Sequence, residues 1–386
     1  MVAVVDIAAV SARVSDKTVW TFVRLETRDG LVGWGEATLH DCAVAIHAHV
    51  RRLTPAIVAR KWPLPTDIID IVGTCGRDAP EAAAISAIDQ ALWDVMAQAR
   101  GDTLARALGE PRRTAIDLYA NINRGTVDRS AAGFAARAIE AISSGFDAIK
   151  IAPFDGVRPD NIDPTDAAKA LALGLGRIAA VRSAIGPDVR LLVDCHWRLT
   201  EASARDVLRE VESLKLYWLE CPLPEEVINF PALRRLRSRA NAMGVRLAGC
   251  EMMIGRQGFR PFLDAGVYDV IMPDVKYAGG VRELERIAQA AALHGVACSP
   301  HNPSGPIAHA HSLHVSAHVP LLPFLEIQHG ESPLFFDFVE GSLPRPRSGR
   351  SDLPQGTGLG LGLGGAALRD RLIDIEDAPT LREVAR

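Results

Sequence analysis

Residues 191–200 read LLVDCHWRLT, and this stretch decides the fold. Three apolar residues lead into Asp194, and His196 follows two positions later. A short apolar run that ends in a carboxylate is typical of a buried parallel strand, which presents that carboxylate at its C-terminal end. One such stretch is a weak signal, because many strands end in Asp at a turn.

The same pattern recurs further along the chain. Five later apolar runs end in, or carry, an acidic residue or a histidine. They are residues 217–221 (YWLEC, with Glu220), 246–251 (RLAGCE, with Glu251), 269–274 (DVIMPD, with Asp274), 296–301 (VACSPH, with His301) and 324–328 (FLEIQ, with Glu326). Chance would scatter such residues, so the recurrence strengthens the prediction.

Helical patterns separate the predicted strands. This alternation favours an α/β fold, a modified (β/α)7β barrel of the TIM type, rather than a doubly wound sheet. The predicted strands are residues 117–121, 148–151, 190–194, 217–220, 246–250, 269–272, 296–299 and 324–327. The predicted helices are residues 130–144, 164–184, 200–213, 230–243, 256–265, 280–294 and 305–318.

The first part of the chain has a different pattern of apolar and polar residues. Residues 1–35 alternate apolar and polar side chains, which predicts antiparallel strands, with a hairpin formed by residues 20–26 and 31–36. Residues 82–99 give the clearest helical pattern. We therefore predict an N-terminal α+β domain to which the C-terminal tail returns. The predicted segments are this α+β domain at residues 1–115, the barrel domain at 116–330 and the returning tail at 331–386.

Composition narrows the function classes. The formal net charge of −4 does not favour a nucleic-acid partner or an anionic membrane. No apolar run reaches the ~18 residues that a transmembrane helix needs, and no signal-peptide pattern is found. The six cysteines show no CxxC or paired spacing, which argues against a disulfide framework. We expect a cytoplasmic protein.

Three of the acids are candidate metal ligands. Active sites of such barrels lie at the C-terminal ends of the strands, where Asp194, Glu220 and Glu251 end the third, fourth and fifth strands. Three carboxylates so close together would repel strongly, and carboxylate oxygens suit Mg²⁺. We predict a Mg²⁺ site; helix caps or salt bridges at strand ends are the alternative.

The remaining strand ends carry candidate catalytic groups. Asp274 and His301 end neighbouring strands ~4.8 Å apart, so the carboxylate can orient the imidazole as a general base. Lys150 could bind a substrate carboxylate, and Glu326 could donate a hydrogen bond if burial keeps it protonated. His196 is a candidate general acid; the alternative is a histidine bonded to a carbonyl group.

These motifs resemble the mandelate racemase branch of the enolase superfamily, which uses a Lys or His base with Mg²⁺ to stabilise an enediolate. The resemblance rests on GWGEA at residues 33–37, on the run AISAIDQALWDVMAQARGDTLARALG at 84–109, and on the strand-end series VDCH, WLECP, GCE, MPDVKYAGG and SPHNPSGP. It implies that Asp194, Glu220 and Glu251 are the metal triad. It also implies that His301 with Asp274 is the family's His–Asp dyad and that Glu326 is its strand-eight acid.

One departure bears on the reaction. Racemases of this branch carry Lys-x-Lys on the second strand, whereas residues 150–152 read KIA, with Lys150 kept and Ala152 in place of the second base. Racemisation needs bases on both faces of the substrate, so it is disfavoured. The Asp-x-His of Asp194 and His196 resembles the family's sugar-acid dehydratases. We therefore expect a Mg²⁺-dependent dehydratase (a hydro-lyase) of an aldonic or aldaric acid, giving a 2-keto-3-deoxy acid.

Two other functions stay open. One is an epimerase or lactone cycloisomerase of the same superfamily, and the other is a non-catalytic sugar-acid binding protein. The family also implies a homo-oligomer and an N-terminal α+β capping domain, completed by the C-terminal tail, that covers the barrel mouth. We expect substrate specificity to depend on residues 11–18, which we predict to be a mobile loop, and on residues 37–42, Arg124 and the loop at 153–164.

Three tempting motifs have simpler explanations. The histidine-rich run at residues 309–318 falls on a predicted helix away from the acids, so we do not expect zinc there. Cys195, Cys221 and Cys250 adjoin the metal ligands, but we expect them to pack as small apolar side chains and not to bind the metal. Residues 358–365 have spacing like GxGxxG, yet no strand precedes them, so we predict a loop. Lys276 is left unassigned.

Overall fold

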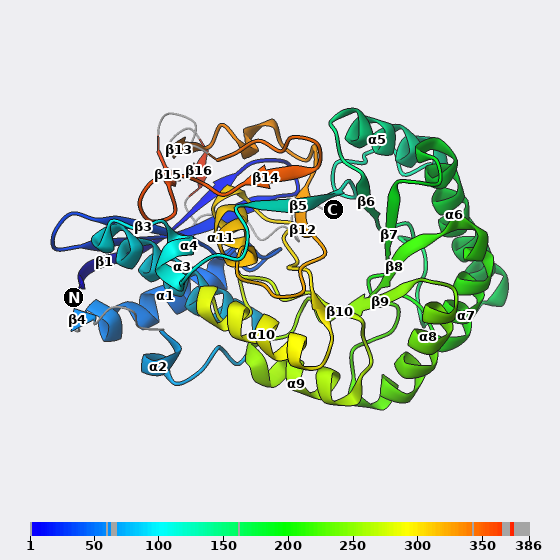
Figure 1. Ribbon diagram of the computed structural model, residues 1–386, viewed down its shortest axis with the longest axis horizontal. Coiled ribbons are helices and arrows are strands. Elements are labelled where there is room, and N and C mark those ends of the chain that lie inside the picture. Colours follow the sequence, from blue (N-terminus) through cyan, green and yellow to red (C-terminus); the bar gives the residue numbers. More distant parts are fainter. Residues whose placement is uncertain are drawn as a thin grey trace.

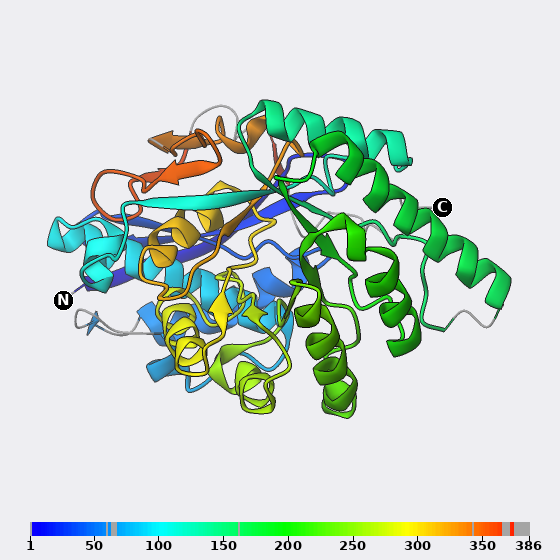
Figure 2. The same ribbon diagram turned by 45° about the vertical axis from the view of Figure 1, so that its right-hand side comes forward.

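The computed structural model describes residues 2–58, 61–62, 68–160, 163–341, 343–364 and 371–373. An N-terminal α+β cap lies against a curled sheet of parallel strands that helices surround (Figures 1 and 2). This is the capped α/β barrel that the sequence predicts. Among the described residues, no helix is both long and apolar enough to cross a membrane.

The cap is built on an antiparallel sheet, as predicted. Its strands β1 (Val2–Arg13), β2 (Val19–Thr27) and β3 (Val32–Glu36) pair in that order. The expected loop at residues 11–18 is shorter than predicted, because β1 continues to Arg13. Ser11 explains the difference: it is buried, and its hydroxyl contacts Thr21 Oγ1 and His47 Nε2, both at 3.0 Å.

Helix α3 (Ala79–Arg100) is the central element of the cap. Asp78 caps its N-terminus by accepting a hydrogen bond from the backbone of Glu81, and Gly101 ends it with a φ of 71°. Every residue from 81 to 97 is buried. Strand β3 packs closely on it, since a Cβ atom at Gly35 would lie 1.9 Å from the carbonyl oxygen of Ala87.

The other elements of the cap are smaller. They are α1 (Ala43–Val58), β4 (Lys61–Trp62), α2 (Ile69–Val72) and α4 (Leu104–Leu108).

The barrel sheet holds eight parallel strands in the order β11-β10-β9-β8-β7-β6-β5-β12. Strands β11 and β12 share no ladder among the described residues, but Cys298 and Ser299 donate hydrogen bonds to the backbone carbonyls of Leu321 and Phe324. These contacts curl the two edges toward one another. The strands are β5 (Ala115–Asn121), β6 (Ala148–Ile151), β7 (Arg190–Asp194), β8 (Leu216–Glu220), β9 (Arg246–Gly249), β10 (Val270–Ile271), β11 (Ala297–Cys298) and β12 (Leu325–Gln328).

Seven helices alternate with these strands, which matches the (β/α)7β prediction. Local capping sets where several begin: Ser130, Asp163 and Thr200 each accept a hydrogen bond from a backbone N–H of the first turn. The helices are α5 (Ala131–Ser143), α6 (Pro164–Ile185), α7 (Glu201–Glu210), α8 (Phe230–Ala242), α9 (Gly255–Ala265), α10 (Val281–Leu293) and α11 (Pro306–Ser316). Short 3₁₀ turns are η1 (Glu212–Leu214), η2 (Val227–Asn229) and η3 (Pro333–Phe335).

The segment after β12 connects the two parts of the molecule. Its strand β14 (Arg350–Asp352) pairs with β5 of the barrel, and β16 (Leu372–Ile373) pairs with β1 of the cap. Strands β13 (Val339–Gly341) and β15 (Leu361–Leu363) pair with each other. Strand β15 replaces part of the loop predicted at 358–365, whose last residue lies outside the described part of the chain. The predicted domain limits at residues 115 and 330 remain predictions.

Candidate active site

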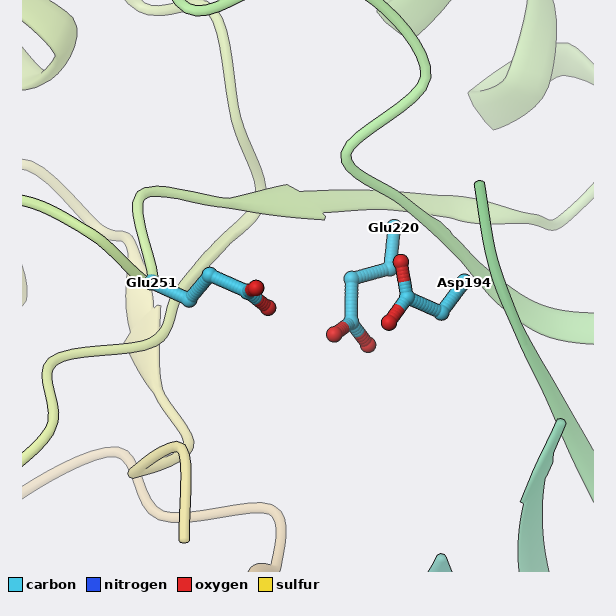
Figure 3. Close-up of side chains that lie close together, drawn as sticks. All are labelled: Asp194, Glu220 and Glu251. Carbon is cyan, nitrogen blue, oxygen red and sulfur yellow. The ribbon is translucent and has the colours of Figure 1, made fainter. Parts of the chain in front are cut away.

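Three acidic side chains meet at the C-terminal ends of neighbouring strands. Asp194 and Glu220 are the last residues of β7 and β8 and are register partners in the ladder, and Glu251 lies two residues beyond β9. One oxygen atom from each lies within 4.8 Å of the others. Figure 3 shows the carboxylates of Asp194 and Glu220 side by side, with that of Glu251 pointing toward them. We call these residues the carboxylate cluster.

The carboxylate cluster suits a divalent cation. All three side chains are buried, and burial raises the pKa of Glu220 to about 7 and that of Glu251 well above its usual value. The Oε2 atom of Glu251 is buried without a hydrogen-bond partner among the described residues. Crowded, buried carboxylate oxygens are donors that suit Mg²⁺, and the unpartnered Oε2 of Glu251 is one that a cation would satisfy. The residues present therefore fit the predicted ion.

Lys150 joins this cluster to the opposite edge of the sheet. Its buried Nζ atom lies 2.8 Å from Oε1 of Glu220 and 3.0 Å from Oε1 of Glu326. Burial alone would lower the pKa of Lys150, but the two carboxylates raise it well above its usual value. The second oxygen of Glu220 accepts a hydrogen bond from Trp218 Nε1 at 2.9 Å. Lys150 is thus a fixed ammonium group beside the cluster.

Glu326 differs from the expectation of a protonated donor. Its Oε1 atom accepts a hydrogen bond from Asn121 Nδ2 at 2.6 Å, and its Oε2 atom accepts one from the backbone N–H of Asn302 at 2.9 Å. Burial raises its pKa, but Lys150, His301 and these donors outweigh burial and lower it to about 2. Glu326 is therefore an ionised acceptor, because both neighbours donate to it.

The His–Asp pair lies beyond the ends of the next two strands. Nδ1 of His301 lies 2.8 Å from Oδ2 of Asp274, which is fully buried. Burial raises the pKa of Asp274, yet Lys276 and His301 outweigh it, so its pKa is lowered. The ionised carboxylate then accepts a hydrogen bond from the Nδ1–H group. This leaves Nε2 of His301 unprotonated and 3.7 Å from Oε2 of Glu251, facing the carboxylate cluster.

Two neighbours of Asp274 also contact the pair, and sequence reasoning did not assign them. The ammonium of Lys276 lies 3.3 Å from Oδ2 of Asp274, and the hydroxyl of Tyr277 lies 3.1 Å from Nδ1 of His301. Asn121 and Asn302 were missed in the same way. Asn121 ends a predicted strand, so widening the strand-end pattern to amides could have found it.

His196 lies at the edge of the cluster, as predicted. Its Nε2 atom lies 2.9 Å from Oδ2 of Asp194, and its backbone N–H donates to Oδ1 at 2.8 Å. Its φ of 46° is left-handed, and its side chain is 37% exposed. The contact is therefore to a carboxylate and not to a carbonyl group. A general-acid role for His196 stays a prediction.

The cap contacts the turns that carry the His–Asp pair. From α3, the amide of Gln90 donates to the carbonyl oxygen of Val275 at 3.2 Å, and Asp89 accepts from the N–H of Val281 at 2.8 Å. From β3, the carboxylate of Glu36 accepts from the N–H groups of Gly305 and Ala308 in the first turn of α11.

The loop at the cap edge also reaches the barrel. Thr18, next to β2, donates to Oε1 of Glu331 at 2.5 Å, and Oε2 of Glu331 lies 3.7 Å from Arg124. Thr18 thus contacts the segment after β12, and Glu331 of that segment contacts Arg124 after β5. From the sequence we expect substrate specificity to depend on this region and on the loop at residues 153–164. Residues 161–162 of that loop lie outside the described part of the chain.

The histidine-rich helix α11 is structural. Its histidines are buried, and burial lowers the pKa of His309 and of His311 to about 3. Nε2 of His311 donates to the carbonyl of Trp34 in the cap, and Nε2 of His318 donates to that of Ala105. In the described residues, the carboxylate cluster is the one group arranged to hold a metal. All six cysteines are free, and Cys195, Cys221 and Cys250 are buried as expected.

Two family models match the chain. Residues 133–366 match an enolase C-terminal domain-like model, and residues 4–109 match the N-terminal domain of mandelate racemase and muconate lactonizing enzyme. The chain belongs to the enolase superfamily. Its mandelate racemase branch, predicted from the strand-end motifs, is confirmed, as is the fold class.

Individual relatives agree with this assignment. A D-galactonate dehydratase from Verminephrobacter eiseniae (strain EF01-2) is 32% identical over 300 residues, which cover 77% of this chain and 75% of that protein. A mandelate racemase/muconate lactonizing enzyme-like protein from Rubrobacter xylanophilus DSM 9941 superposes with a TM-score of 0.85, at 29% identity and 98% coverage of both chains. An enolase superfamily member from Salmonella Typhimurium gives 0.84, at 26% identity, covering 97% of this chain and 99% of that one. The prediction of an enzyme, a lyase, is confirmed.

Proposed function

We propose that this enolase superfamily member is a Mg²⁺-dependent dehydratase of a sugar acid. One observation carries the proposal: Nε2 of His301 faces the carboxylate cluster, 3.7 Å from Glu251, with Nδ1 held by Asp274. The second strand offers Ala152 where racemases have another base. One base on one side of the substrate, with His196 beside the cluster, suits elimination better than racemisation.

The reaction begins with proton removal. Asp194, Glu220 and Glu251 would hold Mg²⁺, which when bound supplies positive charge against the charge that develops on the substrate carboxylate. Lys150 adds an ammonium charge in a buried setting, where charge interactions are stronger than in water. Nε2 of His301 takes the proton from the carbon α to the carboxylate, and Asp274 stabilises the imidazolium that forms.

Elimination of water completes the reaction. The electron pair of the broken C–H bond forms the C2–C3 double bond as the bond from C3 to its hydroxyl breaks. His196 donates a proton to this leaving hydroxyl, so water is released. The enol that remains tautomerises to a 2-keto-3-deoxy acid. Glu326 keeps Lys150 in place through their ion pair.

The substrate proposal begins with aldonic acids. The D-galactonate dehydratase that matches this chain makes D-galactonate the first substrate to test. A library of aldonic and aldaric acids covers the rest of the substrate class.

The test is turnover of this library by the Mg²⁺-loaded protein, with detection of 2-keto acid product. A 2-keto-3-deoxy product that His301→Asn no longer makes, and that His294→Asn still makes, supports the proposal; His294 is a histidine at the exposed end of α10. Two outcomes contradict it. Deuterium uptake at the α carbon in D₂O without any dehydration, or an isomer formed without loss of water, indicates an epimerase or cycloisomerase. Binding without either reaction indicates a binding protein.

The predicted homo-oligomer belongs to the same proposal. Light scattering of the purified chain after size exclusion gives its mass directly, and a mass of 41.5 kDa would contradict the expectation.

A further inference from the structure

The imidazole of His301 has two neighbours at the same nitrogen. Oδ2 of Asp274 lies 2.8 Å from Nδ1, and the hydroxyl oxygen of Tyr277 lies 3.1 Å from it. The rings of Tyr277 and His301 are tilted by 55°, with centroids 6.5 Å apart, so the contact is made by the hydroxyl and not by the ring face. The family resemblance assigns a role to Asp274 but none to this hydroxyl.

Both neighbours come from one tight turn after β10. The backbone carbonyl of Asp274 accepts hydrogen bonds from the N–H groups of Tyr277, at 3.1 Å, and Ala278, at 2.8 Å. The N–H of Lys276 donates to Oδ1 of Asp274 at 2.8 Å. These bonds fix the position of Tyr277 relative to Asp274, so both side chains contact His301 from the same turn.

The cap holds this turn from the other side. The amide of Gln90 donates to the carbonyl of Val275, and Ser86 accepts a hydrogen bond from the N–H of Gly279. Tyr277 is 1% exposed. A buried phenol on an anchored turn has little freedom to leave Nδ1.

We propose that Tyr277 is a positioning residue for His301, an inference that rests on the proposed role of His301 as the base. Nδ1 carries one proton, and the ionised Asp274 accepts the hydrogen bond that this N–H group donates. The Tyr277 hydroxyl oxygen is a second acceptor for the same N–H group. Two contacts restrict rotation of the imidazole about its Cβ–Cγ bond more than one does. Nε2 then stays directed at the carboxylate cluster.

Tyr277 acts through His301 and not on the substrate. Its hydroxyl contacts Nδ1, whereas Nε2 is the atom near Glu251. Burial also raises the pKa of Tyr277 well above its usual value, so the phenol keeps its proton. Proton transfer depends steeply on how the base is aligned with the bond it attacks, so a more mobile ring slows this step.

The test compares Tyr277→Phe with Tyr217→Phe in the Mg²⁺-loaded full chain. The first variant removes only the hydroxyl at Nδ1; the second removes a hydroxyl at the start of β8, at the opposite end of the barrel. We expect Tyr277→Phe to lower kcat about tenfold, the value of one hydrogen bond of roughly 1.4 kcal/mol, with KM and Mg²⁺ affinity within about twofold. An unchanged kcat, or equal losses in both variants, would overturn the inference.

A second readout does not depend on the substrate. In protein labelled with ¹⁵N-histidine, the Nδ1–H signal that disappears in His301→Asn belongs to His301. We expect this signal to shift in Tyr277→Phe and to stay in place in Tyr217→Phe. If the wild-type protein dehydrates no sugar acid, the proposed function fails and this signal alone decides. An unshifted signal would then overturn the positioning role.

Discussion

The carboxylate cluster and the His–Asp pair occupy neighbouring parts of one barrel rim but are held in different ways. Asp194 and Glu220 are the last residues of strands of five residues each, so the sheet ladder itself places them. Asp274 and His301 lie three residues beyond strands of only two residues. A backbone hydrogen bond from the N–H of His301 to the carbonyl of Pro273, at 3.2 Å, joins their segments. The cap adds contacts from Gln90 to the turn after Asp274 and from Glu36 to the start of α11.

This difference indicates that metal binding and proton abstraction depend on side chains that different parts of the molecule hold in place. The barrel positions the residues that would bind the cation, and the cap helps to position the base. Metal affinity and proton abstraction should therefore respond to different substitutions. Each of the following experiments tests whether metal binding and proton abstraction can be changed independently.

The largest effect is expected at the base itself. His301→Asn keeps the size and polarity of the side chain but removes the basic nitrogen, so kcat should fall on the order of 10³-fold or more. Mg²⁺ affinity, measured by calorimetry, should change less than about threefold, because the cluster is placed by the ladder. His294→Asn is the control. A large loss of Mg²⁺ binding in His301→Asn would show that metal binding and proton abstraction are not independent.

The next effect is expected in the carboxylate cluster. Glu251→Gln removes one anionic ligand from a buried site, so Mg²⁺ affinity should fall on the order of 100-fold. Glu226→Gln, at an exposed residue after β8, should leave affinity unchanged. Calorimetric titration with Mg²⁺ gives both values. Equal affinities for the two variants would contradict the assignment of the cluster as the metal site.

A smaller effect is expected from the cap. Gln90→Ala removes the hydrogen bond from α3 to the turn of Asp274, so kcat should fall about tenfold while Mg²⁺ affinity is kept. Gln98→Ala is the matched control, because Gln98 lies on the same helix and, among the described residues, its side chain donates to Val32 and Asp94 within the cap. Steady-state kinetics of both variants decide. If both lose activity equally, the cap contributes only general stability.

The smallest effect concerns pH and the junction of α11 with the cap. Burial lowers the pKa of His311 to about 3, against about 6.5 when unfolded, so the unfolded chain binds a proton that the folded chain does not. Stability is thus lost as pH falls below about 6.5. His311→Gln should not lose stability in this way, because its side chain at position 311 binds no proton in this pH range.

Urea unfolding measures that difference. Between pH 6.5 and 5.5, the wild-type protein should lose about 1 kcal/mol more of its unfolding free energy than His311→Gln does. Parallel pH dependence in the two proteins would contradict the assignment of His311 as a neutral buried group.

The strands and the cluster could be predicted because both depend on local pattern. Strand β7 spans the predicted residues 190–194, and its last residue is the predicted ligand. Once the barrel is inferred, residues at strand ends must converge. The predicted strands at 269–272 and 296–299 shrink to two residues each, because pairing with their neighbours is confined to those positions.

Features that depend on distant residues could not be predicted in this way. The ionised state of Glu326 depends first on Lys150 and His301 and then on hydrogen bonds from Asn302 and Asn121, all of which come from other segments of the chain. The Tyr277 contact depends on how a turn folds, and strand periodicity says nothing about turns. The loop at residues 11–18 was overestimated because the polar Ser11 finds partners inside the cap.

Helix α3 has a consequence for exchanging parts between relatives. It is buried along nearly its whole length, with β3 against it and the turn at residues 275–281 bonded to it. A chimera that takes its cap from one relative and its barrel from another would join a helix and a turn that never adapted to each other. Such a transplant needs α3 and that turn from the same parent. New substrate preference obtained by cap exchange alone would otherwise come with a misaligned base.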